Sequence, residues 1–287
     1  VLMENTHGIS FQQGATNTYT AGGGVKSTTS GDFEFTIDTL NHTASSTQVT
    51  AAGYKYKNHS ATYNEAAPHA EAWAGRTKVG HTVENNTLKV TGGTINTAAY
   101  GGVVENNKLD GGGNPLPTGD AEKNTVAVSG GTVANAYGAE VRTKDGNATE
   151  NSAEITNGTV GSAYGASLAA ANAAGTADKS KVNISGSANI TGDVYGGHIA
   201  QANATGTITN SEVNISGGTV NGSVYGGDNA GSGNATGGTL SISGGNVGGT
   251  IYGNHTNAGD ATGATINITG GTLHDVYGGF ANGTGKT

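Results

Sequence analysis

Several short runs of this chain alternate strictly between apolar and polar residues. In "KVNIS", "EVNIS", "TLSIS" and "TINIT" the apolar residues fall on one face, and Asn or Ser falls between them. Alternation with period two and many β-branched residues is typical of a half-buried β-strand. The alternation predicts inward-facing core positions at Val182, Ile184, Val213, Ile215, Leu240, Ile242, Ile266 and Ile268.

A second short phrase follows each run, and "GGTVNGSVYGG" at residues 217–227 is one copy of it. Val220 and Val224 are four residues apart, so we expect both to lie on the inward face of one strand. Tyr225 then lies on the outer side, at the bend before a glycine pair. Because glycine adopts positive φ without strain, both glycine pairs are expected to turn corners of the chain.

The aromatic residue before the glycines marks a repeat that runs through most of the chain. Its copies are separated by 27, 37, 27, 31, 30, 27 and 25 residues, and a period of this size is the signature of a repeat architecture. The aromatic positions are Trp73, Tyr100, Tyr137, Tyr164, Tyr195, Tyr225, Tyr252 and Tyr277.

Each repeat offers two short strands with one apolar side, which cannot enclose a core alone but can stack on their copies. The repeats therefore predict an all-β fold, a right-handed parallel β-helix (β-solenoid) of about eight coils of 25–37 residues. The alternative is a β-propeller, although its four strands per blade need more apolar runs than each repeat contains. The frequent glycines exclude helix as the main element.

Two regions depart from the repeat. Residues 1–72 carry more aromatic and charged residues, and we expect an irregular N-terminal region there, either a cap over the end of the solenoid or divergent coils, before the repeats of residues 73–287. The longest interval holds Pro115 and Pro117. Because proline has no N–H group to donate to the hydrogen bonds of a β-ladder, a protruding loop is expected near residues 108–124.

Composition narrows the class of protein further. Glycine supplies 52 of the 287 residues without a collagen period, and only 12% of the residues are charged. The net charge of −8 argues against a nucleic-acid partner. The absence of cysteine excludes a disulfide framework and a thiolate metal site. The chain has no apolar stretch of about 18 residues, so no membrane span is expected in it.

The copies "NISGGTVNGSVYGGDNAGSGNATGGTLSISGGNVGGTIYGN" resemble the glycine-rich passenger repeats of large autotransporter adhesins, which Gram-negative and related anaerobic bacteria export by type V secretion. The resemblance covers roughly residues 73–285. In that family the passenger is typically a right-handed β-helix displayed on the cell surface. The resemblance therefore implies a passenger fragment that acts as an adhesin or surface stalk, at the cell surface or outside the cell.

The residues that carry chemistry show no catalytic, cofactor-binding or metal-binding pattern. Asp193, Asp228, Asp260 and Asp275 are scattered, mostly beside Gly or Asn, as acids that cap turns are. The eight histidines include no HExxH motif and no pair at metal-ligand spacing. No catalytic residue, cofactor or metal is therefore predicted, and an enzyme acting on polysaccharide is the least favoured function.

The repeated aromatic residues have two interpretations. They are weak binding candidates, forming a ribbon of rings for a sugar or a protein, or they are an aromatic ladder that shields a corner and sets the register. The ladder is favoured, because a binding site is usually local whereas these residues recur in nearly every repeat. The binding candidates are Trp73, Tyr195, Tyr225, Tyr252 and Tyr277.

These observations predict a non-enzymatic adhesin or stalk that attaches to host or neighbouring cells through a surface glycan or protein receptor. Recognition is expected in the loops or in residues 1–75. The alternative is a self-assembling structural protein of extracellular fibres, with homo-association through exposed coil edges.

Overall fold

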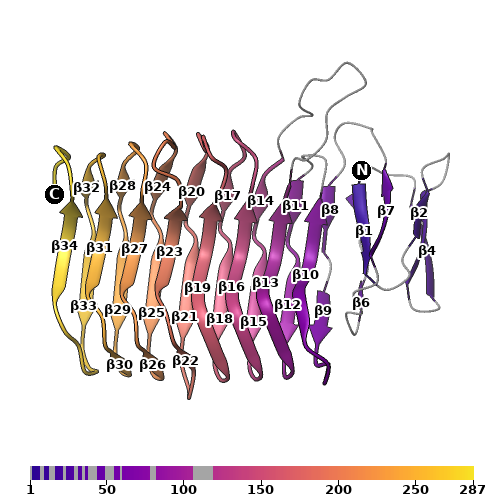
Figure 1. Ribbon diagram of the computed structural model, residues 1–287, viewed down its shortest axis with the longest axis horizontal. Coiled ribbons are helices and arrows are strands. Elements are labelled where there is room, and N and C mark those ends of the chain that lie inside the picture. Colours follow the sequence, from indigo (N-terminus) through magenta and orange to yellow (C-terminus); the bar gives the residue numbers. More distant parts are fainter. Residues whose placement is uncertain are drawn as a thin grey trace.

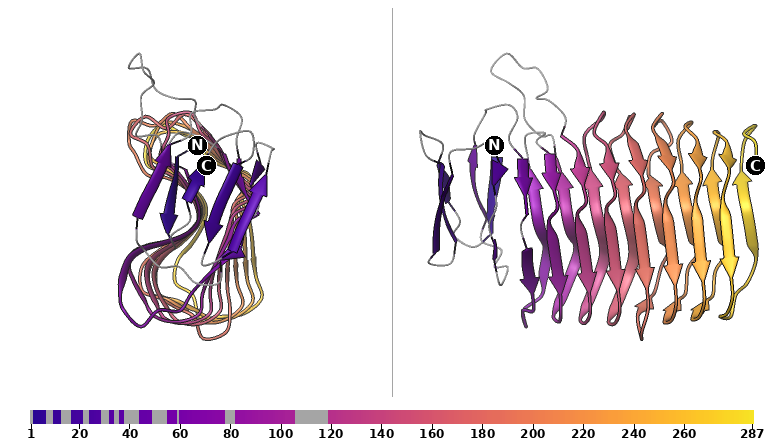
Figure 2. Two further views of the ribbon diagram at one scale, coloured as in Figure 1. Left: turned by 90° about the vertical axis from the view of Figure 1, so that its right-hand side faces the viewer. Right: turned by 180° about the vertical axis from the view of Figure 1, so that it is seen from behind.

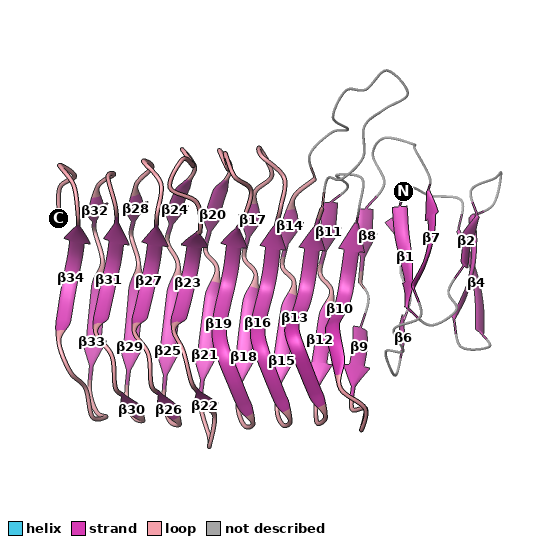
Figure 3. Ribbon diagram, viewed as in Figure 1, coloured by secondary structure: helices cyan, strands magenta, loops and turns pink. Residues whose placement is uncertain are grey.

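The computed structural model describes residues 58, 60–77, 82–105 and 119–287 in full, and within residues 1–57 it describes the backbone of the strands alone. All regular structure in the described residues is β-strand, as Figure 3 shows. Three parallel sheets run along the stack of coils, and each coil from residue 55 onward contributes to all three sheets (Figure 1).

Sheet 1 consists of nine very short strands in chain order, one per coil. They are β5 (Asp32–Phe33), β8 (Lys55–Lys57), β11 (Thr82–Glu84), β14 (Ala121–Glu122), β17 (Ala148–Thr149), β20 (Thr176–Asp178), β24 (Thr207–Thr209), β28 (Ala235–Thr236) and β32 (Ala261–Thr262). Sheet 2 holds the alternating runs: β6 (Thr36–Ile37), β9 (Ser60–Tyr63), β12 (Thr87–Val90), β15 (Thr125–Val128), β18 (Ser152–Ile155), β21 (Lys181–Ile184), β25 (Glu212–Ile215), β29 (Thr239–Ile242) and β33 (Thr265–Ile268).

Sheet 3 holds the aromatic residues of the repeat. Its main strands are β10 (His69–Thr77), β13 (Thr94–Val104), β16 (Thr132–Val141), β19 (Thr159–Leu168), β23 (Val194–Ile199), β27 (Val224–Asn229), β31 (Ile251–Thr256) and β34 (Val276–Ala281). The short strands β22 (Asn189–Ile190), β26 (Thr219–Val220) and β30 (Asn246–Val247) extend it. Two antiparallel sheets lie at the N-terminal end: β1 (Leu2–Thr6) with β7 (Ala44–Gln48), and β2 (Ser10–Gln12) with β3 (Asn17–Ala21) and β4 (Gly24–Thr28).

Every strand of the three long sheets pairs in parallel with its own copy in the next coil. The coils superpose when the molecule is viewed along its axis (left panel of Figure 2). This arrangement confirms the predicted parallel β-helix, and the β-propeller alternative is wrong. The right-handed sense of the coil stays a prediction.

The core has two parts, which lie on either side of a narrow waist. The larger cluster joins sheet 2 to the first half of the sheet 3 strands, and the smaller cluster joins sheet 1 to their second half. Eight of the ten predicted core residues are at most 1% exposed: Val182, Ile184, Val213, Ile215, Val220, Val224, Leu240 and Ile242. Ile266 is only partly buried and Ile268 is 45% exposed, because no described coil stacks over β33.

The two glycine pairs of the repeat have different roles, which corrects the expectation that both turn corners. Gly218 has a φ of 78° and turns the corner between sheets 2 and 3. Gly226, in contrast, lies inside β27, which continues to Asn229. A Cβ atom on Gly226 would lie 2.1 Å from the carbonyl oxygen of Gly253. This glycine is therefore needed for close approach of the backbone to the next coil.

One further expectation about strand boundaries changes. Val220 and Val224 both point inward, but they belong to separate strands, β26 and β27, instead of one. The parallel stack includes residues before 73, since β9 pairs with β12 in the same sheet, and divergent coils were one of the two alternatives for that region. Of the loop expected near residues 108–124, residues 108–118 lie outside the described residues, together with both prolines, and Ala121–Glu122 forms β14.

The close approach to the next coil predicts that alanine destabilises the protein at Gly226 but is tolerated at Gly278, which occupies the same position of the repeat. Gly226→Ala should destabilise the protein by about 3 kcal/mol, because overpacking against backbone forces the coils to shift. Gly278 occupies the same position in the last described coil, where a Cβ atom meets nothing within 4 Å. Gly278→Ala should therefore change the free energy of unfolding by less than about 1 kcal/mol in urea denaturation. Equal effects of the two substitutions would contradict the idea that contact with the next coil excludes a Cβ atom at this position.

Candidate functional site

The outer face of sheet 3 carries a continuous tyrosine ladder, defined here as the seven repeat tyrosines from Tyr100 to Tyr277. Register places each tyrosine opposite the tyrosine of the next coil. The ring centroids of successive pairs lie 5.2, 4.4, 4.8, 5.1, 5.0 and 5.5 Å apart, and the planes differ by at most 18°. These are offset-stacked geometries that stabilise aromatic pairs.

Stacking decides what the ladder offers to a ligand. Each inner ring has both faces against neighbouring rings, so only ring edges and hydroxyls reach the surface. Partial burial of the hydroxyls raises the pKa of Tyr164, Tyr195 and Tyr225. Of the five aromatic binding candidates, Tyr195, Tyr225, Tyr252 and Tyr277 lie in this ladder, and Trp73 lies in register with Tyr100. The guanidinium of Arg76 lies 4.5 Å from the centroid of the Trp73 ring.

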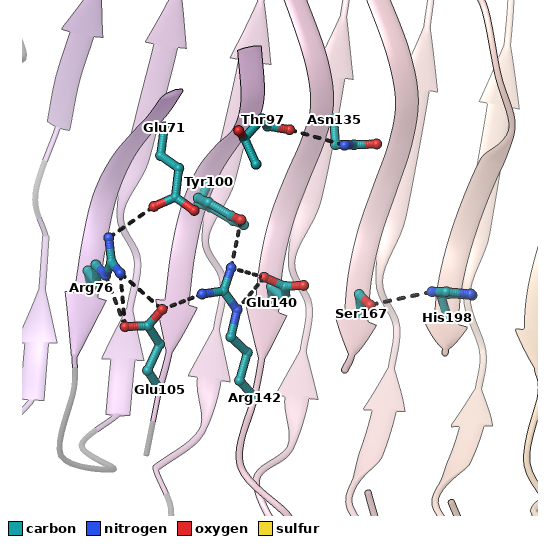
Figure 4. A network of polar contacts seen from close by, with 10 residues as sticks. All are labelled: Glu71, Arg76, Thr97, Tyr100, Glu105, Asn135, Glu140, Arg142, Ser167 and His198. Atoms are coloured by element: carbon teal, nitrogen blue, oxygen red, sulfur yellow. Dashed lines mark hydrogen bonds and ion pairs between the residues drawn. The ribbon is translucent and has the colours of Figure 1, made fainter. Parts of the chain in front are cut away.

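A cluster of charged residues surrounds the N-terminal end of the ladder (Figure 4). Glu105 accepts hydrogen bonds from both Arg76 and Arg142, and only 4% of its side chain is exposed. Arg142 also donates to Glu140 at 2.7 Å and to the hydroxyl of Tyr100 at 2.7 Å. Burial raises the pKa of Glu140, although the neighbouring Arg142 opposes the shift. The cluster is completed by Glu71, which accepts from Arg76 at 3.2 Å.

The charged cluster does not form a pair of catalytic acids. Glu105 and Glu140 are both engaged by guanidinium groups, which holds them as ion-pair partners. A shallow pocket of about 260 Å³ lies beside the cluster, lined by Ala70, Glu71, Trp73 and Thr97. Glu71 is the one carboxylate among the described residues of that lining, so these residues do not supply the two facing acids of glycoside hydrolysis.

A second polar column lies three residues beyond the tyrosines. Asp228 lies between two imidazoles: His255 Nδ1 is 2.6 Å from Oδ1, and His198 Nε2 is 3.7 Å from Oδ2. Ser167 Oγ lies 3.4 Å from His198 Nδ1. The order Ser, His, Asp is that of a hydrolase triad, but Ser167 is only 3% exposed and lies within a paired strand. A substrate carbonyl therefore cannot reach its hydroxyl, and the column joins one coil to the next.

The aspartates have divided roles. Asp193 and Asp260 accept hydrogen bonds from backbone amides, but from those of the next coil instead of their own turns: Ser223 at 2.7 Å and Lys286 at 2.8 Å. Asp228 departs from the expectation by pairing with histidines. Sequence reasoning missed this column and the charged cluster, because the contacts that join their coils connect residues 27 to 42 positions apart. The available signal was the register itself, since residues at the same offset from each tyrosine must be neighbours.

The fold and this face define the protein as a parallel β-solenoid with a tyrosine ladder. No protein-family model, curated protein or solved structure matches the chain. Within the described residues, no three histidine or acidic side chains gather at positions suited to a metal ion. The part of the chain that the structure describes also contains no helix that could cross a membrane.

The charged cluster predicts a large effect of removing its shared acid. Glu105→Gln should lower the free energy of unfolding by about 3 kcal/mol, because two partly buried guanidiniums lose their common carboxylate. Glu212→Gln is the control, since its partner Lys181 and its own side chain are 36% and 38% exposed. The control should cost less than about 1 kcal/mol in urea denaturation. A loss at Glu105 as small as that at Glu212 would show that the cluster adds little to stability.

The histidine column predicts a pH dependence of stability. Burial lowers the pKa of His198 below its ordinary value of 6.5, and it outweighs the opposing effects of Asp228 and Asp193. As pH falls through 6.5, His198 binds a proton in the unfolded chain but stays neutral in the folded protein. The free energy of unfolding therefore falls with pH until the pKa of His198 in the folded protein is reached. His198→Gln should flatten this decline in denaturation curves measured between about pH 7 and about pH 5. His274→Gln, at an exposed position, should leave the decline unchanged.

Proposed function

We propose that this chain is a non-enzymatic stalk or adhesin at a bacterial cell surface, a passenger fragment of the autotransporter kind that its repeats resemble. The observation that supports this most directly is the use of the polar residues on sheet 3. The carboxylates, guanidiniums and imidazoles described above contact side chains of adjacent coils. Side chains committed to holding coils together suit a rigid support better than a catalyst.

Recognition is assigned to the parts of the chain that do not repeat. The segments that lead from β16, β19, β23, β27 and β31 to the next sheet 1 strand differ in length and sequence, and these five lie along one edge of the solenoid (Figure 1). In the segment between β23 and β24, Gln201 and Asn203 are exposed, and Asn203 donates to Asn172 of the previous coil at 2.7 Å. Such an edge offers adaptable hydrogen-bonding groups to a glycan or a protein receptor.

An extracellular fibre is the second candidate function. Among the described residues, the large apolar side chains that are exposed are Ile268, Val276 and Tyr277, and all belong to the coil of β32, β33 and β34. The edge strands β33 and β34 contain neither charged residues nor proline, the features that usually prevent strands from pairing with other molecules. Homo-association through coil edges of this kind would build the fibre.

Binding and microscopy of the purified chain test the two functions together. The labelled protein should appear as isolated rods in electron micrographs and bind particular members of a panel of surface glycans and matrix proteins. The double variant Gln201→Ala and Asn203→Ala should reduce that binding, whereas Ser241→Ala, on the outer face of sheet 2, should leave it unchanged. Filaments without receptor binding would favour the fibre, and cleavage of a polysaccharide in the panel would overturn the non-enzymatic proposal.

A further inference from the structure

We propose that the tyrosine ladder is a site of oxidative modification, where one-electron oxidation joins Tyr195 to a stacked neighbour as dityrosine. The bond would connect adjacent coils covalently in a chain that has no cysteine. The proposal rests on the geometry of the ladder and is independent of what the solenoid binds.

Stacking supplies the two partners that the coupling requires. The Tyr195 ring lies 4.8 Å from that of Tyr164 and 5.1 Å from that of Tyr225, with interplanar angles of 7° and 5°. Parallel register aligns the three side chains at one position of successive coils. The ring carbons beside each hydroxyl therefore lie near the same carbons of the next coil. The coupling requires one ring to turn out of the stack toward the partly exposed edge before two of these carbons can bond.

Asp193 makes Tyr195 the expected point of oxidation. A neutral phenol that gives up an electron must also release its hydroxyl proton. The Tyr195 hydroxyl donates to Asp193 Oδ2 at 3.2 Å, so a carboxylate is in place to accept that proton. Tyr100 has a different environment, because its oxygen accepts a hydrogen bond from Arg142. Among the ladder tyrosines, all of which lie in the described part of the chain, Tyr195 is the one hydrogen-bonded to a carboxylate.

The reaction needs an external oxidant, and hydrogen peroxide with a haem peroxidase is the chemical class that supplies it. Each of two tyrosines loses one electron and one proton and becomes a tyrosyl radical. The radicals form a carbon–carbon bond between the positions beside the oxygens, and the hydrogen on each new tetrahedral carbon moves back to oxygen. The product lacks two hydrogen atoms, and the peroxide is reduced to two molecules of water.

Treatment of the full chain with peroxidase and peroxide tests the proposal. Dityrosine fluorescence should appear in the monomer fraction after size-exclusion chromatography. Digestion at acidic residues separates the three tyrosines, because Asp178 lies between Tyr164 and Tyr195 and Glu212 lies between Tyr195 and Tyr225. Mass spectrometry should then find two of these peptides joined with the loss of two hydrogens. Oxidised protein should also unfold at a higher temperature than untreated protein, because the bond restrains the unfolded chain.

Matched variants distinguish this site from general tyrosine oxidation. Tyr195→Phe keeps a stacking ring but lacks the hydroxyl, so the cross-linked peptide and the rise in unfolding temperature should both disappear. Asp193→Asn should slow cross-linking at Tyr195 severalfold, whereas Tyr252→Phe should leave that cross-link unchanged. The proposal is overturned if dityrosine joins only separate molecules, or if Tyr195→Phe forms as much cross-linked monomer as the wild type.

Discussion

The constraint on which this structure depends is that nearly every residue lies about 4.8 Å from the residue at the same position of the next coil. Identical neutral side chains benefit from this proximity, as the stacked tyrosines do, but identical charges repel at this distance. The charges that do occur on successive coils mostly alternate in sign. Lys181 faces Glu212, and Lys123, Glu150 and Lys179 occupy one corner of three successive coils. Glu84 opposite Glu122 is an exception. The low charge content of the chain follows from the same constraint.

The waist adds a second constraint, which explains why the tyrosine is always accompanied by glycine. The sheet 3 strands contribute residues to both core clusters. At the waist between the two clusters, the backbone of sheet 3 lies very close to the start of the sheet 2 strands. A Cβ atom on Gly138 would lie 2.6 Å from backbone atoms of Ser152, so no other side chain fits there. The adjacent tyrosine lies on the outer side of the waist, where its ring stacks on other rings instead of filling the core. In the Tyr-Gly dipeptide, the glycine thus allows the close approach of the backbone and the tyrosine forms the stack on the outer face.

The parts of the fold that could be predicted from the sequence are those whose interactions are local in sequence. Alternation within four residues identified the sheet 2 strands, and the period of the aromatic residues identified the coils. The sheet 1 strands carry no such local signal, because they are two or three residues long and their corners rarely use glycine. Lys123 and Glu150 adopt φ values of 54° and 56° there. Behind these corners Asn86, Asn124 and Asn151 form a buried amide ladder, which no local pattern indicates.

In the candidate site, too, the features that follow from local sequence patterns could be predicted, and those that depend on contacts between distant residues could not. The ladder followed from the period, but the charged cluster required a register in which Arg76 and Arg142, 66 positions apart, share Glu105. These are the two arginines of the chain, and both lie over aromatic rings at the same end of the ladder. Each planar guanidinium can bind a carboxylate at its edge while its face covers a ring, which lysine cannot do. Arginine is therefore placed where the stack of rings begins, and it covers aromatic surface while its charge is neutralised.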